Sequence, residues 1–142
     1  VSENHSDVFR GRNVLTTLSK DNDLSWVSDW VDFYVAEHSV DAVLFYDNAS
    51  KTYGAEDILS ALKRPGVRAA VVVKWPFKYG PQGIGKEHWD SDYCQYSMIE
   101  HARRRFACWT NYALRCYERG RPTTGTLASR DLRQRLQPFE KK

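Results

Sequence analysis

Apolar residues with two kinds of spacing divide the first hundred or so residues of the chain into alternating elements. Short runs of aliphatic, β-branched and aromatic residues predict buried strands at 13–19, 41–46 and 67–75. Apolar residues that recur every three or four positions predict helices at 25–38, 55–63 and 89–106. Strands and helices that alternate in this way are typical of an α/β fold. We therefore predict a three-layer α/β/α arrangement with a mainly parallel sheet and right-handed crossovers.

The last third of the chain departs from this pattern. We predict helices at 109–119 and 131–136, and the glycines, proline and threonines of 120–126 interrupt the segment between them. No convincing fourth strand follows residue 106. Nine arginines lie between Arg103 and Arg135, so this part is basic. We divide the chain into an α/β domain over 1–106 and a basic, irregular tail over 107–142 that is weakly ordered or helical.

The composition fits one soluble domain. The chain has 142 residues, of which 42% are hydrophobic and 27% charged. Its longest apolar run, 69–73, is far too short to cross a bilayer, and the first residues lack the pattern of a secretory signal, so we expect a cytoplasmic protein. The spacing of Cys94, Cys108 and Cys116 is unlike that of zinc or redox motifs, which favours reduced thiols.

Two acidic residues, Asp21 and Asp47, follow predicted strands directly. Ligands of open parallel sheets bind beyond the carboxyl ends of the strands, where a carboxylate can accept a hydrogen bond from a base N–H or a ribose hydroxyl. A turn is also the place where Asp47 and Asn48 cap the backbone that follows. Position alone leaves both interpretations open. Trp26 and Trp30, four residues apart on one predicted helix, are interpreted as core residues that pack on the sheet.

Several motifs in this order resemble those of a known family. They are Lys20-Asp-Asn-Asp23, the tryptophan-containing segment 30–41, Tyr46-Asp-Asn-Ala-Ser50, and the sequences VVVKW and QYSMIEHARRRF. Residues 13–106 resemble the amino-terminal, nucleotide-binding half of the GT-A glycosyltransferases, in the branch of families 2 and 92 that serves polysaccharide biosynthesis. The resemblance implies transfer of a sugar from a nucleoside-diphosphate sugar of the UDP type to a glycan or a lipid-linked acceptor.

The resemblance assigns six residues to the donor site: Thr17, Lys20, Asp21, Asp47, Lys74 and Trp75. It implies that Thr17 lies beside the nucleotide and that Asp47 accepts the base N–H. Lys20 and Asp21 would lie near the ribose or the phosphates.

At the end of the third strand, Lys74 and Trp75 would form part of the wall of the same pocket. Gln95 and residues 101–103 match a family element that comes before the metal site in the sequence. The resemblance assigns no ligand contact to these residues. Catalytic residues are not assigned.

The chain departs from the family after residue 106. The family carries an Asp-x-Asp cluster there that holds Mg²⁺ or Mn²⁺, whereas this segment has only the scattered acids Glu118, Asp131 and Glu140. A divalent metal is thus expected for the intact family, but its ligands are not found in this chain. We interpret the sequence as the donor-side half of a transferase, cut short or shifted in reading frame after about residue 106.

Other classes of function remain open at this stage. The chain could be a non-catalytic α/β module that binds a nucleotide or a protein, or an inactive fragment. The arginines near the end of the chain could meet anionic lipid at the inner membrane surface, which would make the protein peripheral. The same residues could meet nucleic acid, which we do not expect to be the partner.

Overall fold

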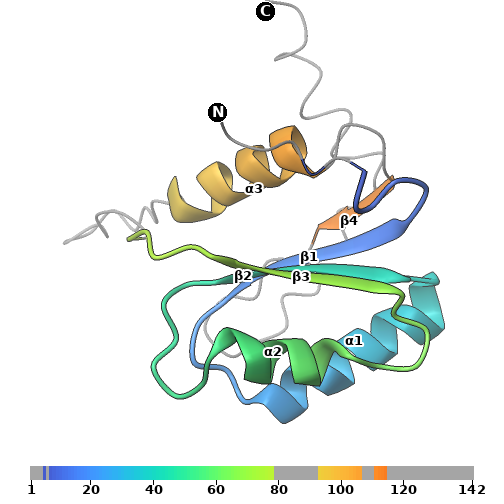
Figure 1. The fold of residues 1–142 in the computed structure, drawn as a ribbon, viewed down its shortest axis with the longest axis horizontal. Helices are drawn as coiled ribbons and strands as arrows, with labels where there is room; N and C mark the ends of the chain where they lie inside the picture. Colours follow the sequence, from blue (N-terminus) through green and yellow to red (C-terminus); the bar gives the residue numbers. More distant parts are fainter. Residues whose placement is uncertain (1–4, 6, 79–92, 107–110, 115–142) are drawn as a thin grey trace, which may run out of the picture.

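Four strands and three helices make up a computed structural model of the chain, which describes residues 5, 7–78, 93–106 and the backbone of 111–114 (Figure 1). In chain order the elements are β1 (Asn13–Ser19), α1 (Leu24–His38), β2 (Ala42–Asp47), α2 (Ala55–Leu62), β3 (Ala69–Lys74), α3 (Tyr93–Arg105) and β4 (Asn111–Leu114). The predicted strands and helices of the first 106 residues are therefore present, with boundaries that differ by one or two residues. The predicted start of the third helix, at 89–92, lies outside the described residues.

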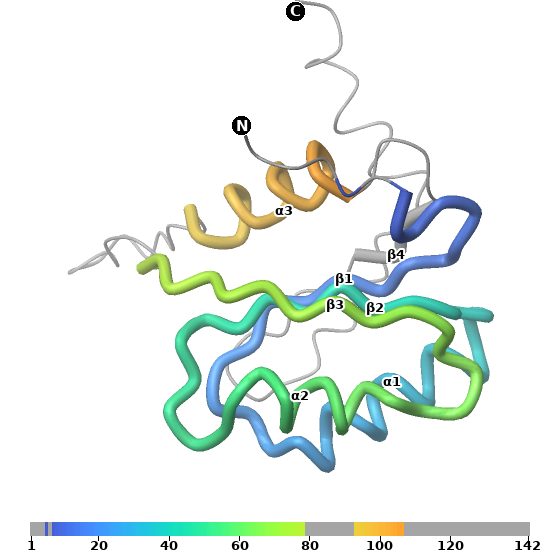
Figure 2. Tube along the Cα trace, in the orientation of Figure 1, coloured from blue at the N-terminus to red at the C-terminus, as the bar shows by residue number. Residues whose placement is uncertain are grey.

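All four strands are parallel, and their order in the sheet is β3-β2-β1-β4. Helices α1 and α2 cover one face of the sheet, and α3 covers the other (Figures 1 and 2). This arrangement confirms the predicted three-layer α/β/α fold with a parallel sheet. Side chains alternate along each strand, so each face of the sheet has a hydrophobic core of its own.

The two cores share the strands but use different residues. Val14, Leu44 and Tyr46 pack on the side of α3. Leu15 and Val43 pack on the side of α1 and α2. Every residue of β2 is buried, which explains why its sequence is almost wholly apolar: helices cover both of its faces and strands pair with both of its edges.

Local sequence explains how α1 begins and how the chain turns between α2 and β3. Asp23 caps α1, because its Oδ1 accepts a hydrogen bond from the backbone N–H of Ser25 at 2.8 Å. Gly66 lies between α2 and β3 with a φ of +95°, and a Cβ added there would lie 2.6 Å from a methyl carbon of Val35. Only glycine allows this turn to approach α1 so closely.

The structure corrects the prediction for the segment after residue 106. Residues 111–114 form strand β4, which pairs with β1, so the helix predicted at 109–119 and the absence of a fourth strand are both wrong at these positions. The short sequence NYAL carries no alternation of its own, and pairing with the edge of β1 makes it a strand. The predictions for the loop 79–92 and for the rest of the tail lie outside the described residues.

The helices α1, α2 and α3 contain 15, 8 and 13 residues. In the part of the chain that the structure describes, none of them combines the length and the apolar character needed to cross a bilayer.

Candidate functional site

The carboxyl ends of the parallel strands meet at one edge of the sheet. The strand order reverses between β1 and β4, since β2 and β3 lie on one side of β1 and β4 lies on the other. In doubly wound sheets ligands bind at this edge, beside the point of reversal. Ser19, Asp47 and Lys74 are register partners there, one from each of three adjacent strands. They form a polar row on the face that α1 and α2 cover.

Beside the buried Ser19 and the exposed Lys74, Asp47 is the buried acid of this row. Its side chain is 8% exposed, and its Oδ1 accepts a hydrogen bond from the backbone N–H of Ser50 at 3.1 Å. The predicted turn-capping role of this residue is therefore confirmed. A carboxylate has two oxygens and about four acceptor positions, so capping one N–H leaves acceptor capacity for a ligand.

Asn48, by contrast, does not cap the turn with its side chain. Its Nδ2 donates hydrogen bonds to the carbonyl oxygens of Trp75 at 2.7 Å and Phe77 at 2.8 Å. Its backbone N–H donates to the carbonyl oxygen of Ser19 at 2.8 Å. The residue thus joins the ends of β1, β2 and β3, a role that the sequence did not indicate.

Asp21 links the loop after β1 to the loop after β2. Its Oδ1 accepts hydrogen bonds from the backbone N–H groups of Lys51 at 2.6 Å and Thr52 at 3.2 Å, and its own N–H donates to Ser50 Oγ at 3.0 Å. The N–H of Lys51 is the main cause that lowers the pKa of the Asp21 carboxyl. In the structure this carboxylate fixes two loops of the carboxyl edge to each other.

Both of these loops contain a non-glycine residue in the left-handed region. Asp21 has a φ of +51° and Ala49 a φ of +56°. Aspartate tolerates this conformation better than alanine does, and such residues gather at ligand sites, where the surrounding contacts hold them. The carboxyl edge therefore combines local strain with a network of hydrogen bonds.

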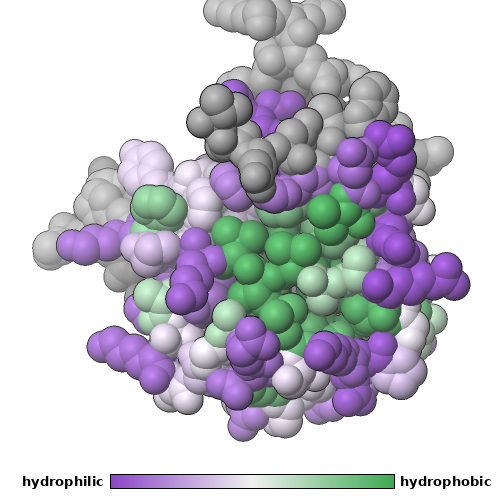
Figure 3. Space-filling view, viewed as in Figure 1, coloured by the Kyte–Doolittle hydropathy of each residue, from purple (hydrophilic) through white to green (hydrophobic). Residues whose placement is uncertain are grey.

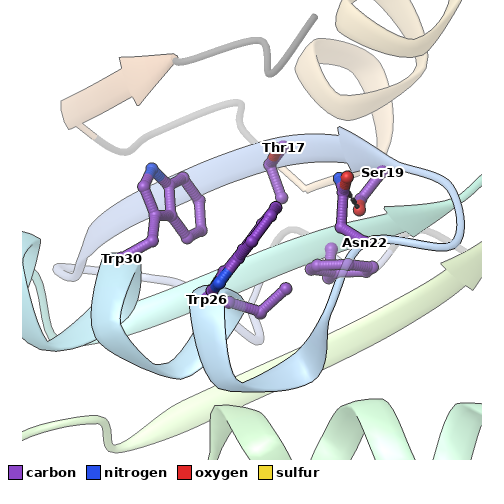
Figure 4. Close-up of a pocket in the computed structure, with 7 residues that line it drawn as sticks. Thr17, Ser19, Asn22, Trp26 and Trp30 are labelled. Carbon is purple, nitrogen blue, oxygen red and sulfur yellow. Dashed lines mark hydrogen bonds between the residues drawn. The ribbon is translucent and has the colours of Figure 1, made fainter. Parts of the chain in front are cut away.

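A pocket opens next to this network, between the end of β1 and the flank of α1 (Figure 4). It is a shallow hollow, partly open to solvent, with a cavity volume of only about 20 Å³, and its wall is almost wholly apolar. The lining residues are Thr17, Ser19, Asn22, Trp26, Val27, Trp30 and Phe45. At its polar end, Asn22 Nδ2 donates to Ser19 Oγ at 2.7 Å. Two indole rings and a phenyl ring suit the pocket to a flat ligand group.

The pocket places the two tryptophans differently from the prediction. Trp30 is buried, as predicted, but the Trp26 side chain is 58% exposed and forms the outer wall of the pocket. The helical spacing places both residues on one flank of α1, and the sequence alone could not show that this flank extends past the covered part of the sheet.

Of the residues that the resemblance assigns to a donor site, Thr17 alone lines this pocket. Its side chain is buried, and its Oγ1 has no hydrogen-bond partner among the described residues. Asp47 lies one strand away. Lys20, Asp21 and Lys74 are exposed at the same edge of the sheet.

Trp75 lies on the other face of the sheet. Its ring contacts those of Tyr46 and His101, and its Nε1 donates to the carbonyl oxygen of Cys94 in α3 at 3.3 Å. It therefore packs with α3 and lies apart from Thr17 and the pocket.

The family-like element on α3 is built into this second core. Gln95 is buried, and Nδ1 of His101 hydrogen-bonds the hydroxyl of Tyr46 at 2.9 Å. Burial, and then the charge of Arg105, lower the pKa of His101, which favours the neutral imidazole. Arg103 pairs with Glu100 on the same helix at 2.8 Å. In this structure these residues hold α3 together and attach it to β2.

The expected divalent metal finds no candidate site in the described part of the chain. Within residues 5, 7–78 and 93–106, no three His, Cys, Asp or Glu side chains lie close enough together to hold a metal ion. These residues therefore do not fit the family's metal, and we derive no step that depends on it. Cys94 is a buried free thiol, whereas Cys108 and Cys116 lie outside the described residues.

Comparison with known proteins gives no match, whether with family models, with curated proteins or with solved structures.

Proposed function

We propose that this chain is the nucleotide-binding part of a glycosyltransferase that uses a nucleoside-diphosphate sugar. The main support is the position of Asp47, a buried carboxylate at the carboxyl end of β2, one strand from the pocket at the end of β1. The sheet is parallel, and its strand order reverses beside β1, where such folds bind nucleotides. The resemblance to the GT-A glycosyltransferases supplies the reaction class.

Asp47 selects the base in this proposal. Uracil carries an imide N–H, which donates a hydrogen bond, whereas cytosine has a lone pair at the same ring position. The free oxygen of Asp47 accepts from the uracil imide and repels the cytosine lone pair. Thr17 lies on the neighbouring strand and lines the pocket, and its buried hydroxyl has no partner in the described chain.

The charged part of the donor lies along the same edge. Lys20 and Lys74 are exposed cations there and attract a diphosphate. The N-termini of α1 and α2 also point to this edge (Figure 1), where the side chains of Asp23 and Asp57 already cap them. The proposed roles of Asp47, Thr17 and the lysines do not require a divalent metal.

Calorimetric titration with UDP and CDP tests the role of Asp47. We expect UDP to bind at least about tenfold more tightly than CDP, because only uracil donates to the carboxylate. Asp47→Asn keeps an oxygen for the N–H of Ser50, so the turn should remain, but the preference for UDP should disappear. Asp29→Asn, on an exposed position of α1, is the matched control and should leave the preference unchanged.

Two results would contradict the proposal. One is equal affinity of the unchanged protein for UDP and CDP, and the other is a preference for UDP that survives in Asp47→Asn. If UDP binds as expected but no UDP-sugar is transferred or hydrolysed, the chain is a nucleotide-binding module and not an enzyme.

A further inference from the structure

Strand β3 forms an open edge of the sheet. It pairs with β2 on one side, and no described element pairs with its other side. Its residues 69–73 are all half-buried, whereas every residue of β2 is buried. Figure 3 has the same orientation as Figure 1, in which β3 lies in front. It shows a continuous apolar area on the side of the molecule that faces the viewer. An apolar edge strand of this kind readily pairs with a further strand.

The direction of the backbone groups follows from the pairing with β2. Directly after β3, the N–H of Trp75 donates to the carbonyl oxygen of Asp47 in β2 at 2.8 Å. Consecutive residues of a strand direct their N–H and C=O groups to opposite edges. Val71 and Val73 therefore face β2 as Trp75 does, and Ala70 and Val72 direct their backbone groups outward.

The charge around this edge indicates what kind of strand it accepts. Residues 63–78 contain five basic residues and no acidic one: Lys63, Arg64, Arg68, Lys74 and Lys78. Arg64 forms an ion pair with Asp32, and the other four are exposed. A second copy of this chain would bring like charges together, which is unfavourable for strands that lie directly opposite each other. A lipid surface would leave the outward N–H and C=O groups without partners.

We propose that the open edge of β3 binds an extended apolar segment of a partner protein, with aspartate or glutamate on its flanks, as a further strand of the sheet. The outward groups of Ala70 and Val72 form the backbone hydrogen bonds, and the exposed Lys63, Arg68 and Lys78 pair with the acidic flanks. This partner site does not depend on nucleotide binding at the carboxyl edge.

The probe is a synthetic peptide of alternating valine and threonine with two acidic residues at each end. On the full chain, we expect it to slow amide hydrogen exchange of Ala70 and Val72 by about tenfold or more, because these amides gain partners. The amides of Val71 and Val73, already bonded to β2, should change much less. A peptide of the same sequence, N-methylated on its pairing side, should not bind, since it keeps the charge and the side chains but lacks the donors.

Two variants sharpen the test. The double variant Arg68→Glu, Lys78→Glu should bind the acidic peptide more weakly and a peptide with lysine flanks more tightly. Ala70→Pro removes the outward backbone N–H of residue 70, a change that an edge strand tolerates. It should also lower the affinity for the acidic peptide. If Ala70→Pro fails to fold, the N-methylated peptide still decides the question.

Four outcomes would overturn the proposal. The first is unchanged exchange at millimolar peptide, and the second is equal binding of the N-methylated peptide. The third is a dimer in sedimentation that protects Ala70 and Val72 without peptide, which would make the occupant a second copy. The fourth is binding to phosphatidylglycerol vesicles that Phe77→Ser abolishes and Ala70→Pro leaves intact, which would make the edge a membrane contact.

Discussion

The two faces of the sheet bury different kinds of side chain. The face covered by α1 and α2 buries mainly aliphatic residues, such as Leu15, Ile58 and Leu62. The α3 face also buries hydrogen bonds, among them those of Tyr46 with His101 and of Asn48 with the carbonyl of Trp75. Apart from the polar row at the carboxyl edge, the first face is held by close packing, which tolerates many apolar sequences. The second face depends also on specific polar partners that join β2 to α3 and to the segment after β3. Substitutions on each face can separate these two kinds of stabilisation.

The largest effect is expected in the aliphatic core. Ile58 is fully buried against the sheet, so Ile58→Ala should lower the free energy of unfolding by ~2–5 kcal/mol through lost burial and the cavity left behind. Urea unfolding followed by circular dichroism measures this. Leu59→Ala, at the half-buried neighbour, is the control and should cost clearly less. Equal losses would mean that α2 does not pack on the sheet through Ile58.

A polar residue on the other face should matter almost as much. Asn48→Ala removes the donor to two carbonyl oxygens and should lower the free energy of unfolding by ~2–3 kcal/mol. Asn22→Ala, which removes one hydrogen bond to Ser19 at the mouth of the pocket, should cost ~1 kcal/mol or less. If both variants lose the same free energy in urea unfolding, the Asn48 side chain does not link the strand ends.

Two adjacent threonines compare the faces directly. Thr16 and Thr17 are buried, point to opposite faces, and have hydroxyls without a hydrogen-bond partner in the described residues. Replacing either with valine should raise the free energy of unfolding by ~1 kcal/mol, because a buried polar group without a partner is destabilising. Only Thr17→Val, at the pocket, should also weaken UDP binding. If Thr16→Val lowers the UDP affinity and Thr17→Val does not, the nucleotide binds on the α3 face, which contradicts the proposal.

The smallest effect is a dependence on pH that belongs to the α3 face. Burial lowers the pKa of His101 below its ordinary value of 6.5, and Arg105 adds to this effect. Between the lowered value and 6.5 the folded protein binds fewer protons than the unfolded chain, so stability falls as the pH falls through this range. Urea unfolding at several pH values measures the loss, and His101→Gln should remove it. If the free energy of unfolding of this variant still falls with pH in the same way, another titratable group causes the loss.

Much of the fold could be predicted from the sequence because spacing and burial agree there. Strand β1 spans the predicted residues 13–19, and α1 begins one residue before the predicted 25–38. Strand β4 could not be found in this way, because its four residues form a strand through pairing with β1. The carboxyl edge was predicted through Asp21 and Asp47, both of which lie there. The link that Asn48 forms between strand ends was missed, and so was the pocket beside Trp26, since their contacts come from elements far apart in the chain.

The sequence by itself determined the order of strands and helices and the alternation of buried side chains, because hydrophobic spacing and turn residues act over a few neighbouring positions. Tertiary structure decided which polar residues have partners. It joined Asp21 to the loop after β2, turned Trp75 towards α3, and left the edge of β3 open among the described elements. These outcomes depend on how strands pair and which face each helix covers, and such contacts between distant segments leave no local pattern in the sequence.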